Sequence, residues 1–462
     1  MPRLIFLSLK RLILSGCAAV ALSACAATVD QSGTFADLSA SVGDRAGGEL
    51  AWRKDSGAAA QIDTRIAELL AAPLTLDGAV QLTLLANGDL QARFADLGMA
   101  KADLVAAGLI ENPVLDVSVR ATDHLAVLEF GIFQNLLDVL MRPSREKVAD
   151  AAYRAEASAV AQDVVSAVGE TRRSYFALLG ARNAAAVLDE VRSAAEASSE
   201  LAAQFHAAGN ISDLELAEEQ ASYQDALIAA DMARIHAAEA ERDFNHAVGS
   251  PEAAAQVGET LPAPPPAAMA AADFDSALAH RLDLAAARRG VDAAVAELKH
   301  VTDYRLWQQL EIGAAVERED DGEWTAGPAF ALSLPLFNQG QPEVARSAMA
   351  VLKAENQVKA LEGSIRAEVR AARTKVDVMS ELLGRYTAKV LPLKAEIVRL
   401  KQREYNFMLV GAFELLIAKR EEGEAYHQYI EALGEYWRAR VDLLDAMGGG
   451  PMKVGTSTGG PA

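Results

Sequence analysis

Cysteine is almost absent from this chain, because its 462 residues contain only Cys17 and Cys25, both near the N-terminus. The rest of the chain can therefore form no disulfide and offers no thiol to a metal site. Aromatic residues make up only 6% of a sequence that is 51% hydrophobic, so its apolar content is mostly Ala, Leu and Val. This mixture favours long, closely packed helices over a compact aromatic core.

Basic residues are scarce relative to acidic ones, with 44 Lys and Arg against 64 Asp and Glu, and the net charge is −20. Binding to a phosphate backbone needs clustered Lys and Arg, so the charge argues against a nucleic acid as partner.

Catalytic patterns are missing as well. The seven histidines show no metal-ligand spacing, and the sequence contains neither a Gly-rich phosphate loop nor a nucleophile elbow. The sequence therefore predicts a protein that is not an enzyme and that has neither a metal site nor a cofactor.

The N-terminus is similar to a bacterial lipoprotein signal. A basic start precedes a short apolar run at 12–24, which is too short to span a bilayer comfortably. The tetrapeptide Leu22-Ser23-Ala24-Cys25 resembles a lipobox, which implies removal of signal peptide 1–24 and covalent lipid (palmitate) on Cys25. Cleavage before Cys17, or an ordinary signal peptide with a chance cysteine, are the alternatives.

One unit of about 200 residues occurs twice in the chain, since strand-like segments and a short Gly-containing turn recur at that offset. The predicted parts are a lipidated N-terminal segment at 25–72, a first repeat at 73–249, a Pro- and Ala-rich linker at 250–272, a second repeat at 273–447 and a flexible tail at 448–462. Residues 27–60 are polar and are expected to be irregular.

Each repeat is expected to contain a helix, a β-hairpin, a very long helix, a tight turn and a last helix. The β-hairpins are predicted at about 113–136 and 306–337, and the helical tips at about 208–212 and 409–412. In the first repeat, a helix is expected from Thr75 to Gly108 and the very long one from Pro143 to Ala207. Ser212-Asp213-Leu214-Glu215 predicts a capping box after the first tip.

A heptad seam in the second repeat predicts knobs-into-holes packing of its long helix. The seam comprises Ile365, Val369, Ala372, Val376, Met379, Leu383, Tyr386, Val390 and Leu393. Pro392 lies inside it and is expected to kink the helix or change its packing.

Two short β-hairpins leave sheet edges unpaired, so the sequence favours an oligomer that closes them.

The order of these motifs resembles the TolC-type outer-membrane efflux factors, lipoprotein branch, over about 73–446. The resemblance rests on Leu74-Thr75-Leu76-Asp77, Gly108-Leu109-Ile110-Glu111-Asn112-Pro113, Leu332-Ser333-Leu334-Pro335-Leu336-Phe337-Asn338, Tyr405-Asn406 and Val410-Gly411-Ala412-Phe413-Glu414-Leu415-Leu416.

This resemblance implies a mainly α fold with a small β part, built from two tandem repeats of a long coiled-coil helical hairpin plus a β-hairpin. Three chains would form a 12-stranded outer-membrane β-barrel and a periplasmic α-helical barrel. The homotrimer would work with a periplasmic adaptor and an inner-membrane pump, and it would conduct small molecules or metal ions out of the cell.

The resemblance also implies the site residues. The tips Ala208-Gly209-Asn210 and Val410-Gly411-Ala412 would contact the adaptor. Turn formation alone is the alternative explanation for their glycines, because a tight helix reversal needs a residue in the left-handed conformation. Tyr405 and Glu414 are the candidates for a periplasmic gate, in which three copies of Glu414 would form an acidic ring. A solvated helix glutamate is the alternative, and the next gate position falls on the apolar Ile417.

Two other functions stay open. One is a duct for type I protein secretion, and the other is a non-channel periplasmic coiled-coil lipoprotein such as an adaptor. An adaptor usually carries one helical hairpin between small β domains, whereas this sequence predicts two hairpins. The exported substrate is not determined by the sequence.

Overall fold

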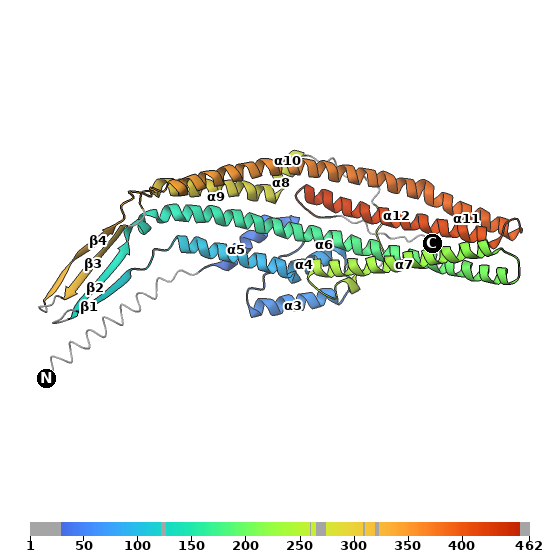
Figure 1. Cartoon of the computed structure of the whole chain (residues 1–462), viewed down its shortest axis with the longest axis horizontal. Helices are drawn as coiled ribbons and strands as arrows, with labels where there is room; N and C mark the ends of the chain where they lie inside the picture. The colour runs from blue at the N-terminus through green and yellow to red at the C-terminus, as the bar shows by residue number, and fades with distance from the viewer. Residues whose placement is uncertain are drawn as a thin grey trace, which may run out of the picture. The chain divides into compact units, whose positions relative to one another are not determined.

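The computed structural model describes residues 29–121, 126–258, 260–264, 274–307, 310–318 and 323–452. These residues form long helices and one small sheet, which confirms the predicted mainly α fold with a small β part (Figure 1). The chain divides into two compact units. Unit 1 contains 29–36, Leu97–Arg154 and Asp292–Val351, and unit 2 contains Asp37–Asp96, Ala155–Val291 and residues 352–452.

The same order of elements occurs twice along the chain. The first series is α4 (Leu76–Ala86), α5 (Gly88–Ala107), β1 (Val114–Ala121), β2 (Ala126–Asn135), α6 (Leu136–Ala207) and α7 (Asp213–Val248). The second is α8 (Phe274–His280), α9 (Leu282–Tyr304), β3 (Leu310–Arg318), β4 (Trp324–Leu332), α10 (Gln341–Arg385), a π-helical segment (Tyr386–Val390), α11 (Leu391–Asn406) and α12 (Ala412–Ala446). No helix among the described residues is both long and apolar enough to cross a membrane.

The expectation of an irregular stretch at 27–60 is wrong. Two helices, α2 (Gln31–Val42) and α3 (Ser56–Leu70), occupy most of its described part. Asp55 begins α3, because its carboxylate accepts a hydrogen bond from the Ala58 N–H at 2.8 Å.

The helix expected from Thr75 to Gly108 is interrupted at Asn87. Thr75 caps α4 as predicted. Asn87 has an extended backbone, accepts a hydrogen bond from the Leu90 N–H at 3.0 Å and donates one to the Ala247 carbonyl at 2.8 Å. It therefore ends one helix, caps the next and ties both to α7.

The long helix α6 begins seven residues before the predicted start at Pro143. The Asn135 side chain accepts a hydrogen bond from the Leu137 N–H at 3.1 Å, so the helix starts directly after β2. Pro143 lies inside this 72-residue helix.

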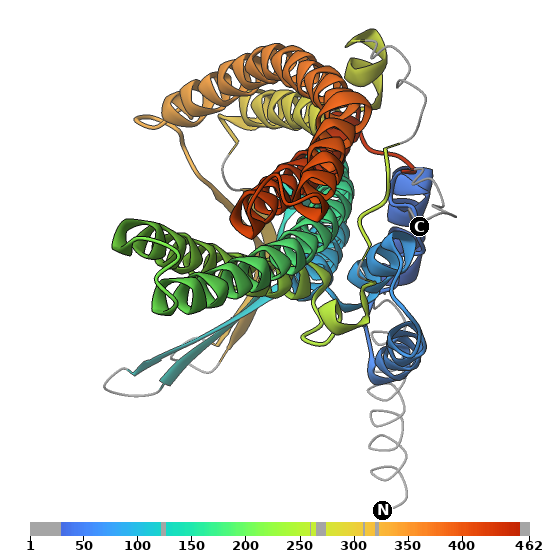
Figure 2. The ribbon, with the colours of Figure 1, turned by 90° about the vertical axis from the view of Figure 1, so that its right-hand side faces the viewer.

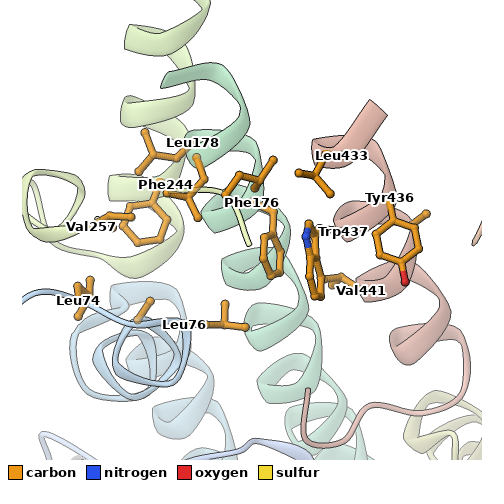
Figure 3. Close-up of a cluster of buried hydrophobic side chains, with 14 of the residues drawn as sticks. Leu74, Leu76, Phe176, Leu178, Phe244, Val257, Leu433, Tyr436, Trp437 and Val441 are labelled. Atoms are coloured by element: carbon orange, nitrogen blue, oxygen red, sulfur yellow. The ribbon is translucent and has the colours of Figure 1, made fainter. Parts of the chain in front are cut away.

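Trp437 of α12 lies in a large buried cluster of unit 2 (Figure 3). Its ring stacks on Phe176 of α6, with centroids 5.0 Å apart and planes 9° apart, and its indole N–H donates to the Pro262 carbonyl at 2.8 Å. Phe244 of α7 and Leu433 of α12 pack into the same cluster. The aromatic contact therefore joins α6 to α12, which are far apart in sequence, and Phe244 brings α7 into the same cluster.

The predicted linker and tail are partly built into this core. Ala253, Val257 and Leu261 of the linker are buried, and the Leu74 N–H donates to the Gln256 carbonyl at 2.7 Å. The described start of the tail, 448–452, also contacts this core, because Arg172 donates to the Gly450 carbonyl at 2.9 Å and Met452 packs on the core.

The heptad seam is buried along α10 and ends at the π-helical segment. Ile365, Val369, Val376 and Leu383 are at most 4% exposed, whereas Leu393 is 62% exposed. Pro392 has no N–H for the Ala388 carbonyl, and the turn before it widens into a π-helix. The expected change of packing at Pro392 is therefore observed, and the seam stops there.

We expect Trp437→Ala to lower the free energy of unfolding by about 3–5 kcal/mol, because it removes a fully buried ring and leaves a cavity. Thermal unfolding followed by circular dichroism would measure the loss. Trp437→Phe keeps the stacking but leaves the Pro262 carbonyl without its donor, so its loss should be smaller. Leu400→Ala, at a side chain exposed on α11, is the control, and an equal loss there would contradict the central role of Trp437.

Candidate functional site

Unit 1 contains a four-stranded antiparallel sheet in the order β1-β2-β3-β4. The two β-hairpins fall where the sequence places them, and they pair with each other through β2 and β3. Directly paired residues have side chains on the same face of a sheet, so the register assigns every residue to one of two faces.

One face of this sheet is almost entirely apolar, and we call it the apolar face. Its described side chains are Leu115, Val117, Val119, Leu128, Phe130, Ile132, Gln134, Leu310, Ile312, Ala314, Val316, Arg318, Trp324, Ala326, Pro328, Phe330 and Leu332. Large members are exposed, and Phe330 reaches 82%. The Trp324 ring stacks on Phe130 at 6.5 Å and lies 5.9 Å from the Arg318 guanidinium. Such a surface is unfavourable in water and calls for an apolar neighbour.

The opposite face, which we call the polar face, has a small ion-pair cluster. Arg120 contacts Glu129 at 3.1 Å and Glu317 at 3.2 Å, and the Ser118 hydroxyl donates to Glu129 at 3.1 Å. Asp116 and Glu311 share this face. Its acidic groups outnumber its one arginine among the described residues, so the face has a net negative charge.

Phe133 covers two glycines on the polar face. A Cβ on Gly131 or Gly313 would come within 2.4 Å or 2.6 Å of the Phe133 ring, so the ring lies flat on both strands. The lack of side chains at these glycines lets the ring pack against the sheet instead of projecting from it.

An ion pair fixes the sheet to the start of α6. The Asp138 carboxylate is buried, pairs with Arg145 and accepts a hydrogen bond from the Glu111 N–H at 2.9 Å. Arg145 also donates to the Leu109 carbonyl at 3.1 Å. The segment entering β1 and the helix leaving β2 are thus held together within unit 1.

Unit 2 contains α7, α11, α12 and α6 from Ala155 on. Within it α6 with α7 and α11 with α12 form two helical hairpins, and each pair runs side by side (Figures 1 and 2). At the first tip Gly209 has a left-handed backbone, with φ of 75°, as predicted. The Asn210 N–H donates to the Phe205 carbonyl at 2.9 Å and closes the end of α6. Ala208 and Asn210 are exposed beside it.

The predicted capping box after the first tip is present. The Glu215 N–H donates to the Ser212 hydroxyl at 3.2 Å, and the Ser212 N–H donates to the Glu215 carboxylate at 2.8 Å. That backbone hydrogen bond lowers the pKa of Glu215.

The second tip differs from expectation, because Gly411 is not its left-handed residue. Met408 takes that conformation, with φ of 57°, and Gly411 has an extended backbone as the N-cap of α12. Phe407, Met408 and Leu409 are exposed, Met408 at 94%, and form what we call the apolar knob. Val410 precedes Gly411, and Ala412 is the first residue of α12.

The gate candidates lie on either side of this tip. Glu414 accepts a hydrogen bond from the Gly411 N–H at 2.7 Å and so caps α12. Tyr405 is half-exposed in the last turn of α11. Phe413 meets Phe205 edge to face at 5.7 Å, which brings the two tips together. Whether Glu414 also forms a ring between copies stays a prediction.

The other expected sites are the lipid and the metal. Cys25 and the alternative Cys17 lie outside the described residues, so lipidation stays a prediction. Across the described ranges, no group of three or more His, Cys, Asp or Glu side chains could hold a metal ion.

The polar-face cluster and the apolar knob were not predicted from the sequence. The first could have been found from Asp116, Ser118 and Arg120, which alternate with Leu115, Val117 and Val119. The second was hidden because the exposure of Phe407–Leu409 depends on where α11 ends.

We expect opposite effects from two substitutions at the left-handed tip residues. Gly209→Ala should lower the free energy of unfolding by about 1 kcal/mol, because a side chain is strained at positive φ. Met408→Gly should raise it by up to about 1 kcal/mol, since it relieves the same strain and loses little packing. Thermal unfolding of both variants measures the difference, and changes of the same sign would contradict the assignment of Met408.

No protein-family model matches this chain, and no curated protein matches it either. Solved structures match its fold over most of its length. A membrane protein from Pseudomonas aeruginosa is 17% identical, with 84% of this chain and 93% of that chain covered and a TM-score of 0.67.

Two further matches have outer-membrane descriptions. The CmeC outer membrane channel of Campylobacter jejuni is 15% identical over 88% of this chain and 92% of that chain, with a TM-score of 0.66. The outer membrane protein VceC of Vibrio cholerae is 15% identical over 86% and 99%, with a TM-score of 0.62. The chain therefore has the fold of solved outer-membrane channels, and the expected TolC-type fold is confirmed.

Proposed function

We propose that this chain is the outer-membrane exit duct of a tripartite efflux system and acts as a homotrimer. The observation that carries the proposal is the division of the four-stranded sheet into an apolar face and a polar face. An outer-membrane strand needs apolar side chains toward lipid and polar ones toward a water-filled interior. The strands have eight to ten residues, close to the roughly 9–11 that a tilted strand needs to cross the hydrocarbon layer.

The edges of the sheet support assembly. Among the described residues, β1 pairs only with β2 and β4 only with β3, so each presents an unpaired row of backbone groups. Such groups cannot remain unpaired in lipid, and joining β1 of one copy to β4 of the next removes both edges. Three copies would give the closed sheet of twelve strands that the family resemblance implies.

The helical hairpins of unit 2 would enclose the path through the periplasm. The two tips, Ala208-Gly209-Asn210 and Val410-Gly411-Ala412, with the apolar knob beside them, would contact the periplasmic adaptor, which in turn joins an inner-membrane pump. Lipid on Cys25 would add an anchor in the outer membrane. The duct itself would perform no chemistry and need no cofactor, and small molecules or metal ions are its proposed cargo.

The test is single-channel conductance of the purified protein in a planar bilayer, run beside the mass of the cross-linked protein. We expect discrete conductance steps and a trimer. A monomer without conductance would overturn the duct and favour a coiled-coil adaptor lipoprotein.

A separate substitution tests the gate. Glu414→Gln removes the charge and keeps an oxygen that can accept the Gly411 N–H, so the tip should stay folded. If three copies of Glu414 form an acidic ring, this variant should change the conductance and weaken the preference for cations. Glu215→Gln is the matched control, because Glu215 caps the first tip through the same kind of contact. Unchanged conductance steps in Glu414→Gln would contradict the gate but not the duct.

A further inference from the structure

A cavity of about 690 Å³ lies in unit 2 beside the π-helical segment. Its wall comes from α6, α11, α12 and residues 260–263. Pockets that hold small organic molecules have volumes of about 300–1,000 Å³, so the cavity has a suitable size.

Pro392 explains why the space exists at this point. The proline interrupts the backbone hydrogen bonds of the helix, and the Leu391 N–H donates to the Tyr386 carbonyl in the π pattern. The heptad seam ends here, so Leu393 turns outward while Pro392 and Ala395 line the cavity. π-helical segments often occur at functional sites, which makes the adjoining space a candidate for binding.

The interior of the cavity is apolar and aromatic. Leu261, Ile430 and Leu433 are buried in its wall. Tyr426 and Tyr429 lie beside them, with ring centroids 5.9 Å apart and planes 37° apart. Burial raises the pKa of Tyr429, so its hydroxyl stays protonated at neutral pH. A flat apolar body would find two rings and three aliphatic side chains.

The two cationic side chains around the cavity differ in their partners. Lys419 pairs with Glu422 at 2.6 Å. Arg420 donates to the Ser222 hydroxyl of α7, and none of the ion pairs within the described ranges involves it. A guanidinium has five N–H donors, so one hydroxyl leaves several for an anion.

We propose that this cavity binds a small anionic amphiphile, with its flat apolar body between the tyrosines and the aliphatic wall and its acidic group on Arg420. The site is formed by the side chains of one copy of the chain. It goes beyond the proposed duct, because binding requires neither conductance nor a trimer.

The probe is 8-anilinonaphthalene-1-sulfonate, which combines an aromatic body with one sulfonate. Its fluorescence is titrated against the full-length protein in detergent, with the signal of detergent alone subtracted. Ala395→Phe fills the cavity and Arg420→Gln removes its cation. Ala238→Phe, exposed on α7, and Arg403→Gln, exposed on α11, are the matched controls outside the cavity.

We expect saturable binding to the unmodified protein. Ala395→Phe should abolish it, and Arg420→Gln should weaken it roughly tenfold through the loss of a charged hydrogen bond. Both controls should bind like the unmodified protein. Ala194→Leu, in the α6 wall, serves as a second filling variant if circular dichroism shows that Ala395→Phe disturbs the helices.

Two results would overturn the site. The first is an absence of saturable binding, which would also result if another copy or another protein filled the cavity. The second is equal binding by the filling variants and their controls, which would place the probe elsewhere. Conductance of the unmodified protein is measured in parallel, so loss of this site and loss of the duct give different results.

Discussion

The unpaired edges of the four-stranded sheet are the constraint on which the rest of the molecule depends. A sheet of this size that exposes Phe330, Ile132 and Leu115 on one face can neither remain in water nor enter lipid with open edges. The proposed closure with other copies would satisfy both conditions at once. Closure would also decide which face of the sheet points inward. With lipid outside, the polar face with Arg120, Glu129 and Glu317 could face only the interior.

The helices are under a different constraint, because long, Ala-rich segments must pack stably with few aromatic side chains. Unit 2 solves it by concentrating rings at one level, where Trp437 stacks on Phe176 and reaches Pro262. Small residues let the helices approach closely elsewhere, as at Gly423, where a Cβ would lie 2.6 Å from Val191. The low aromatic content therefore reflects close helix packing and not a weak core.

Much of this architecture follows from local sequence patterns. The β-hairpins, Gly209, the Ser212 capping box and the buried part of the seam depend on periodicity and on turn chemistry that a few neighbouring residues decide. The expectations that were wrong concern segments whose structure depends on contacts with residues far away in the sequence. Asn87 ends α4 partly because Ala247 accepts its amide, and the described part of the linker is held by hydrogen bonds from Trp437 and Leu74 to its carbonyls. No local pattern contains those partners.

The tips show that a local sequence pattern can also fail to predict the conformation of a single turn. Both hairpins reverse through one left-handed residue, but a glycine takes that position in the first and Met408 takes it in the second. Gly411 is instead an extended N-cap whose N–H meets Glu414. A capping role restricts the Glu414 carboxylate to the helix start, so any charge it presents to a path between copies is presented from a fixed place. The capping contact and a gate are therefore compatible, because the hydrogen bond that orders the turn would also position the charge.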